Sequence, residues 1–199
     1  MLVIARDRTK QSHTIKMPER KNILAICGST RQNSANLHII NAIAKIGVDK
    51  LTITLYDLTT LPFFNQDITD EQAPNSVKTF REAVSKADGV IICTPEYVFS
   101  LSGILKNAIE WMVSTTVFMD KLTALITASS SGEKAHESLL LVMKTLGIKT
   151  SDELCLLISG VKSKLNSDGE VIDMELKDKL ERLAQVLFIV TKPKAPPVS

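Results

Sequence analysis

The sequence has few cysteines and no CxxC pair. Its three cysteines, Cys27, Cys93 and Cys155, lie far apart, each inside an apolar segment. An odd number of widely spaced cysteines in predicted strands argues against a disulfide framework and favours a reduced, cytoplasmic protein. Because cysteines are not paired and the three histidines are scattered, neither zinc nor an iron–sulfur cluster has a visible set of ligands. We therefore expect no metal site.

Long apolar runs and a strong charge imbalance are absent too. No apolar run approaches the roughly 20 residues that a membrane-spanning helix needs. The formal net charge is only +2 at pH 7, too small to indicate a nucleic-acid partner. With 199 residues, 44% of them hydrophobic and 23% charged, the chain has the composition of one globular domain with a full core. We expect neither a membrane nor a nucleic acid as partner.

The two ends of the chain differ from its middle. Residues 1–20 are mixed and aperiodic and have no continuous apolar segment of the kind found in secretory signals. Residues 192–199 are rich in proline. We expect a flexible N-terminal extension over residues 1–20, a single domain over residues 21–191 and a disordered tail over residues 192–199.

Between the ends, short apolar runs alternate with amphipathic patterns. Runs that are apolar on both faces are typical of a parallel sheet covered by helices on each side. Right-handed crossovers leave few topologies, of which the doubly wound strand order 2-1-3-4-5 fits this length. The fold class expected is therefore α/β. The predicted strands cover residues 22–27, 51–58, 89–94, 122–128 and 154–159, and the predicted helices cover residues 35–46, 76–87, 100–114, 133–146 and 170–190.

The loop GSTRQNSAN follows the first predicted strand. A loop that binds phosphate needs backbone amides, hydroxyl donors and the N-terminus of a helix. Ser29 and Ser34 supply hydroxyl groups, and Asn36 supplies a side-chain amide. Arg31 supplies a guanidinium group, whose paired N–H donors suit phosphate oxygens. Alternatively, these polar residues only cap the following helix. Because the loop contains an arginine and lies at the point where the strand order reverses, we favour anion binding.

Spacing argues against three other phosphate sites. GxxxxGK[ST] and GxGxxG are both absent, which argues against a nucleotide-hydrolysing P-loop and against a Rossmann dinucleotide site. Cys27 and Arg31 suggest a cysteine-dependent phosphatase, but only three residues separate them where that chemistry needs five. Cys27 also ends an apolar strand, where an inert packed thiol is the ordinary interpretation.

A second unusual loop, TPEYVFSLSG, follows the third predicted strand. Pro95 stiffens the exit from the strand, and Glu96 and Tyr97 follow where a planar ligand would lie. The backbone amides of such a loop can donate to ring carbonyls, and an aromatic side chain can pack against a ring. Taken alone, the segment is equally consistent with a proline-containing turn and a partly buried tyrosine.

Together, the two loops resemble a known family. GSTRQNSAN resembles the GSxRxxSxN loop of the NADPH-dependent FMN reductase family, a flavodoxin-like group that includes chromate, quinone and azo-dye reductases. TPEYVFSLSGILKNAIEW resembles the family segment TPEYNxSxPGxLKNAIDW, and the similarity in element order extends over roughly residues 21–190. The resemblance implies a flavodoxin-like three-layer sandwich that transfers hydride from NADPH or NADH through bound FMN to a quinone, azo, chromate or flavin acceptor. It also implies a homodimer or homotetramer.

By this resemblance, the first loop holds the FMN phosphate and the second lines the isoalloxazine ring. Val98 replaces the family's usual asparagine, Ser102 stands where proline is common, and three serines occupy a loop after the fourth strand that is normally rich in glycine. Ser100, Lys106 and Asn107 match family positions, as supports for the TPEY loop or as subunit contacts. The expected cofactor-binding residues are Ser29, Arg31, Ser34, Asn36, Pro95, Glu96, Tyr97, Val98, Ser129 and Ser130.

No catalytic side chain is expected, because the chemistry in this family takes place at the flavin N5. Glu96 is interpreted as structural and His136 as a solvated helix residue. Asp67, Asp70 and Glu71 are interpreted as a solvated entry to a helix. Two alternatives remain open: a non-enzymatic flavodoxin-like electron carrier or FMN-binding interaction module, and a fold relative that has lost flavin. Carrier flavodoxins tend to be acidic, unlike this chain.

Overall fold

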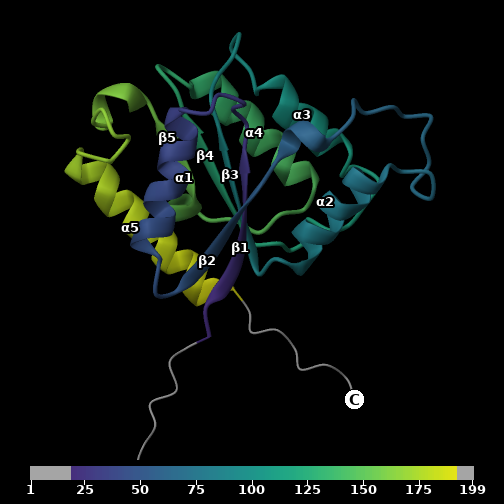
Figure 1. The fold of residues 1–199 in the computed structure, drawn as a ribbon, viewed down its shortest axis with the longest axis horizontal. Coiled ribbons are helices and arrows are strands. Elements are labelled where there is room, and N and C mark those ends of the chain that lie inside the picture. Colours follow the sequence, from purple (N-terminus) through teal and green to yellow (C-terminus); the bar gives the residue numbers. More distant parts are fainter. Residues whose placement is uncertain (1–18, 192–199) are drawn as a thin grey trace, which may run out of the picture.

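The computed structural model of the protein describes residues 19–191 (Figure 1). Its sheet has five parallel strands in the order β2-β1-β3-β4-β5, as predicted. The strands are β1 (Lys21–Cys27), β2 (Leu51–Tyr56), β3 (Gly89–Thr94), β4 (Thr123–Ala128) and β5 (Cys155–Ile158). The helices are α1 (Ala35–Ile46), α2 (Asn75–Lys86), α3 (Gly103–Glu110), α4 (Glu133–Thr145) and α5 (Met174–Val190), with short 3₁₀ turns η1 (Leu58–Thr60), η2 (Asp152–Leu154) and η3 (Val161–Lys164).

The sheet separates two apolar cores. Every residue of β3 and β4 is buried, which explains why these segments are apolar without alternation. Along β3, Ile91 packs with α1 and α5 on one face, whereas Val90 and Ile92 pack with α2, α3 and α4 on the other. Figure 1 shows α1 and α5 side by side on their face of the sheet. The three-layer α/β sandwich is therefore confirmed.

Two helices are shorter than the sequence predicted. α3 covers residues 103–110 instead of 100–114, because Ser102 has an extended backbone and the chain after Glu110 forms tight turns. The apolar periodicity nevertheless continues, since Leu101 and Met112 stay buried outside the helix. α5 begins at Met174, where Asp173 Oδ1 accepts a hydrogen bond from the Leu176 amide at 2.7 Å.

The expected tail, residues 192–199, and nearly all of the expected extension, residues 1–20, lie outside the described residues. Within the described part, β1 begins at Lys21 and α5 ends at Val190. We propose residues 21–191 as the limits of the domain. Among the helices of residues 19–191, none has both the length and the apolar character needed to cross a membrane.

Candidate functional site

A cavity of about 360 Å³ lies at the carboxyl ends of the central strands. Its walls come from the loops that follow β1, β3 and β4 and from the segment between β5 and α5. Nine of the ten predicted cofactor-binding residues line it together: Ser29, Arg31, Ser34, Asn36, Pro95, Glu96, Tyr97, Ser129 and Ser130. The tenth, Val98, does not line the cavity and is 95% exposed.

The first loop leaves β1 through Gly28, which is packed against its neighbours. A Cβ atom at this position would lie 2.8 Å from Thr94 Cβ and 2.9 Å from Ser102 Oγ. The Gly28 amide donates to the Cys93 carbonyl at 2.8 Å, so the loop starts in register with the end of β3. A glycine is therefore required here by close approach.

The polar side chains of this loop shape it by accepting hydrogen bonds. Ser34 Oγ accepts from the Leu37 amide at 3.1 Å and caps α1, and Ser29 Oγ accepts from the Arg31 amide at 3.4 Å. Each hydroxyl only accepts in these two bonds, so neither bond uses its proton. Helix capping and anion binding, the two interpretations of this loop, are thus compatible in one geometry.

Asn36 occupies a more internal position than the predicted phosphate contact. Its Nδ2 donates to the Ala128 carbonyl at 3.2 Å, and its Oδ1 accepts from the Cys93 thiol at 3.3 Å. Burial raises the pKa of Cys93 well above its ordinary value, which keeps that thiol protonated and able to donate. Asn36 therefore ties the first turn of α1 to the ends of β3 and β4.

The thiol of Cys27 does not have the properties of a nucleophile. Burial raises its pKa, and its Sγ donates to the Ser29 carbonyl at 3.6 Å. A thiol that stays protonated is a poor nucleophile. This agrees with the packed thiol predicted from the sequence.

In the second loop, Tyr97 and Ser100 exchange both backbone hydrogen bonds, each at 3.0 Å. The two residues between them, Val98 and Phe99, have φ values of 51° and 55°. A two-residue turn with two positive φ values is the geometry that asparagine and glycine favour. A β-branched residue is strained in it, so the departure from the family's asparagine at this position has a conformational cost.

We expect Val98→Asn to stabilise the protein by about 1 kcal/mol, because asparagine tolerates the left-handed conformation. Urea unfolding of the full chain measures the change. The control is Val113→Asn, which alters an exposed valine whose φ is not positive. Equal effects of the two substitutions would show that side-chain polarity, and not the turn conformation, causes the stabilisation.

Glu96 has the structural position predicted for it. Its Oε2 accepts from the Ala135 amide at 3.0 Å, within the first turn of α4. The residue before that helix, Gly132, has no side chain to cap it. The carboxylate therefore caps α4 from the second loop. Its negative charge also interacts favourably with the positive end of the helix dipole. This contact joins the loops that follow β3 and β4.

The serine loop after β4 is held by the chain that follows β5. The Ser129 amide donates to the Ile158 carbonyl at 3.1 Å, and the amides of Gly160 and Val161 donate back to the carbonyls of Ser130 and Ser129 at 3.0 and 3.1 Å. These bonds fix Ser129 and Ser130 at the cavity wall without the glycines that are usual in the family.

Asn107 supports a different loop from the one predicted. Its Nδ2 donates to the Pro62 carbonyl at 3.0 Å and its Oδ1 accepts from the Phe64 amide at 2.7 Å, so it binds the loop after β2. Trp111 Nε1 donates to the same Pro62 carbonyl at 2.9 Å. Lys106 forms an ion pair with Glu110 at 2.6 Å on the surface of α3.

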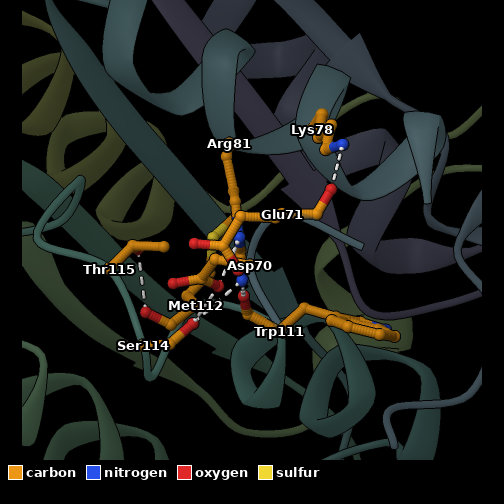
Figure 2. Close-up of polar contacts among 8 residues, drawn as sticks. All are labelled: Asp70, Glu71, Lys78, Arg81, Trp111, Met112, Ser114 and Thr115. Atoms are coloured by element: carbon orange, nitrogen blue, oxygen red, sulfur yellow. Dashed lines mark hydrogen bonds and ion pairs between the residues drawn. The ribbon is translucent and has the colours of Figure 1, made fainter. Parts of the chain in front are cut away.

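Asp70 lies in the loop before α2 and its side chain is 49% exposed, and it also belongs to a hydrogen-bonded network that the sequence did not predict, as Figure 2 shows. Arg81, whose side chain is only 13% exposed, forms an ion pair with Asp70 at 2.8 Å and donates to the Trp111 carbonyl at 2.7 Å. Ser114 Oγ donates to Asp70 Oδ1 at 2.7 Å. Hydrogen bonds from Ser114 and Arg81 lower the pKa of Asp70. The network fixes the loop before α2 to the C-terminal end of α3.

His136 is a helix residue as predicted, but it is half-buried and not fully solvated. Its Nδ1 lies 3.1 Å from Oγ1 of Thr127, a fully buried residue near the end of β4. Burial lowers the pKa of His136, so the ring is neutral near pH 7. The side chain does not line the cavity.

Sequence reasoning missed the fourth wall of the cavity, which lies between the strand predicted to end at residue 159 and the helix predicted to begin at residue 170. Residues 164–172 form a hairpin, in which the Ile172 amide donates to the Lys164 carbonyl at 3.0 Å and Gly169 packs against the ring of His38. The signal was present, since NSDG is a turn sequence. The cavity residues of this wall are Val161, Lys162, Leu165, Asn166, Ser167 and Gly169.

Comparison with known proteins identifies the family. The model of the family described as NADPH-dependent FMN reductase matches residues 21–162. A probable NADPH:quinone oxidoreductase 2 of Oryza sativa subsp. japonica is 32% identical over 173 residues, covering 82% of this chain and 85% of the relative. An NAD(P)H-dependent FMN reductase of Pseudomonas aeruginosa is 27% identical, covering 86% and 95%.

Among solved structures, FerB, a flavoenzyme NAD(P)H:(acceptor) oxidoreductase from Paracoccus denitrificans, is similar with a TM-score of 0.71 and 25% sequence identity. The similarity covers 84% of this chain and 95% of FerB. The two loop motifs, the strand order and the family match agree: this chain belongs to the NADPH-dependent FMN reductase family.

Proposed function

We propose that the protein is an FMN-dependent NAD(P)H oxidoreductase that reduces a quinone, azo, chromate or flavin acceptor. The observation that carries the proposal is the convergence of the Arg31 loop and the Pro95–Tyr97 loop on one cavity at the carboxyl ends of β1 and β3. Ligands of doubly wound sheets bind at this switch point. FMN, when bound, supplies the redox chemistry by accepting hydride from the nicotinamide and passing electrons to the acceptor.

The donors around the cavity fit FMN. Arg31 and the hydroxyl protons of Ser29 and Ser34 would hold its phosphate at the N-terminus of α1. The second loop and the serine loop after β4 would line the ring, and the hydrogen bonds between 129–130 and 158–161 would keep that wall in place. The residues for the ring are Pro95, Glu96, Tyr97, Ser129 and Ser130.

No side chain of the cavity is needed as a general base. The Glu96 carboxylate is engaged by the Ala135 amide, and Nε2 of His38, the histidine among the described residues of the wall, lies 2.6 Å from Asn33 Oδ1. The role of the chain is to orient the ring, to limit its exposure to water and to leave one face accessible to reductant and acceptor in turn.

The partners proposed are a small-molecule electron acceptor and a second or further copies of the chain, as a homodimer or homotetramer. Exposed Val98 and Phe99 beside the cavity and exposed Val113 after α3 provide apolar surface for such contacts. We also propose a cytoplasmic location, supported by three cysteines that are free.

FMN reconstitution of the full chain tests this function. We expect one FMN bound per chain and consumption of NADPH or NADH that depends on both FMN and an added benzoquinone. Protein that binds FMN but does not consume either reductant would indicate an electron carrier or interaction module. Protein that binds no FMN would contradict both functions.

A further inference from the structure

Two basic side chains of the cavity have no carboxylate partner. Arg31 and Lys162 both line it, and within residues 19–191 neither takes part in an ion pair. Among the described residues of the wall the one carboxylate is that of Glu96, and it accepts a hydrogen bond from the backbone of α4. The wall therefore has an excess of positive charge that is not neutralised by the protein itself.

Two hydrogen bonds link the residue before Lys162 to the first turn of α1 through the end of β4. Asn36, in the first turn of that helix, donates to the Ala128 carbonyl at 3.2 Å, and the Val161 amide donates to the carbonyl of the next residue, Ser129, at 3.1 Å. Lys162 follows Val161 directly. The first bond connects α1 to the end of β4, and the second connects the residue after β4 to the start of η3.

A second contact reaches the same turn of α1 from the other side of Lys162. Gly169, in the hairpin that follows η3, packs against the ring of His38, and His38 Nε2 lies 2.6 Å from Asn33 Oδ1 in the first loop. The segment that carries Lys162 is therefore held to the loop after β4 at Val161 and to the first turn of α1 at Gly169. Lys162 itself lines the cavity together with Ser29, Arg31 and Ser34 of the first loop.

We propose that Lys162 is a second cation for the phosphate group of the flavin cofactor, in addition to Arg31. The proposal rests on the proposed function and adds a binding residue outside the two family motifs. A phosphate monoester is close to dianionic at pH 7, so a single arginine leaves it with net negative charge. A lysine from the segment after β5 balances that charge as a point cation, whereas Arg31 provides directional hydrogen bonds.

Paired titrations with FMN and riboflavin test the proposal, because the two flavins share a ring and differ in the phosphate. The apoprotein of the full chain is titrated by quenching of flavin fluorescence. We expect Lys162→Gln to weaken FMN binding about tenfold and to leave riboflavin binding within about twofold of wild type. Lys162→Arg is expected to restore most of the FMN affinity, since it keeps the charge.

The matched control is Lys177→Gln, which removes an exposed lysine of α5 that does not line this cavity. It is expected to leave both affinities unchanged. Arg31→Gln serves as the reference for a phosphate contact of the first loop, and we expect it to weaken FMN binding but not riboflavin binding.

Three results would overturn the proposal. Unchanged FMN affinity in Lys162→Gln excludes the contact, and equal losses for FMN and riboflavin indicate a disturbed wall instead of a lost phosphate contact. An increased KM for NADPH with unchanged FMN affinity assigns Lys162 to the reductant. If wild-type protein binds neither flavin, the proposed function itself fails, which is distinct from any of these outcomes.

Discussion

Gly28→Ala is expected to weaken FMN binding about 30- to 100-fold and to lower the free energy of unfolding by about 1–3 kcal/mol. The added methyl group would meet Thr94 Cβ at 2.8 Å and Ser102 Oγ at 2.9 Å, and Thr94 Oγ1 more closely still. Thr94 and Ser102 are themselves buried, at the end of β3 and before α3. Neither can move without displacing the second loop, so the substitution changes both loops of the cavity.

The matched control is Gly103→Ala, because a Cβ at Gly103 meets nothing within 4 Å. Alanine also favours helix at this first position of α3. Urea unfolding measures stability, and fluorescence titration measures the Kd for FMN. If Gly28→Ala binds FMN as tightly as Gly103→Ala does, close packing at Gly28 does not position the phosphate loop.

Arg81→Ala is expected to lower the free energy of unfolding by about 1–3 kcal/mol, chiefly through the lost hydrogen bonds to the Trp111 carbonyl, while changing the FMN affinity of the folded protein less than about twofold. Arg81 donates to the Trp111 carbonyl from Nε and Nη2, and to Ser114 Oγ and Asp70 as well. Its loss leaves the carbonyl and the Asp70 carboxylate without their charged partner. None of these groups lines the proposed FMN cavity.

Lys86→Ala is the comparison for Arg81→Ala, because Lys86 lies on the same helix and its ion pair with Glu82 is largely exposed. We expect a change of at most about 0.5 kcal/mol for it. Equal stability losses in the two variants would contradict the structural role of the Arg81 network. A large loss of FMN affinity in folded Arg81→Ala would contradict its separation from the cofactor site.

The same network predicts a pH dependence. Hydrogen bonds from Ser114 and Arg81 lower the pKa of Asp70 in the folded protein below its value in the unfolded chain. The stability that this difference contributes is present above the unfolded pKa, near pH 4, and is lost as the pH falls through the folded pKa. Asp70→Asn is therefore expected to flatten the acid limb of the stability curve measured by urea unfolding.

The fold was predictable because its signals are redundant. β3 and β4 are apolar at every position since both faces of the sheet are covered, and the loops that depart most from ordinary turns follow β1 and β3. Once the strands were found, chain connectivity left few topologies. The helix start at Ala35 was also predictable, because Ser34 is a capping residue in front of an amphipathic pattern.

The rest of the site depends on contacts between residues that are distant in sequence. Glu96 caps a helix that begins 37 residues later, at Glu133, and Lys162 reaches the cavity only because the chain after β5 pairs with Ser129 and Ser130. No local pattern encodes such partners. Val98 shows the converse: the motif placed it near the cofactor, whereas the turn geometry directs it outward.

Anaerobic titration of the FMN-reconstituted full chain with NADPH, and separately with NADH, tests the central claim most directly. The cavity is proposed to hold FMN with one face open to a nicotinamide, so at least one reductant should remove the visible absorption band of oxidised flavin at an equimolar amount. Addition of a benzoquinone should then restore the band. A band that persists in the presence of excess NADPH and of excess NADH would contradict the assignment as an NAD(P)H oxidoreductase.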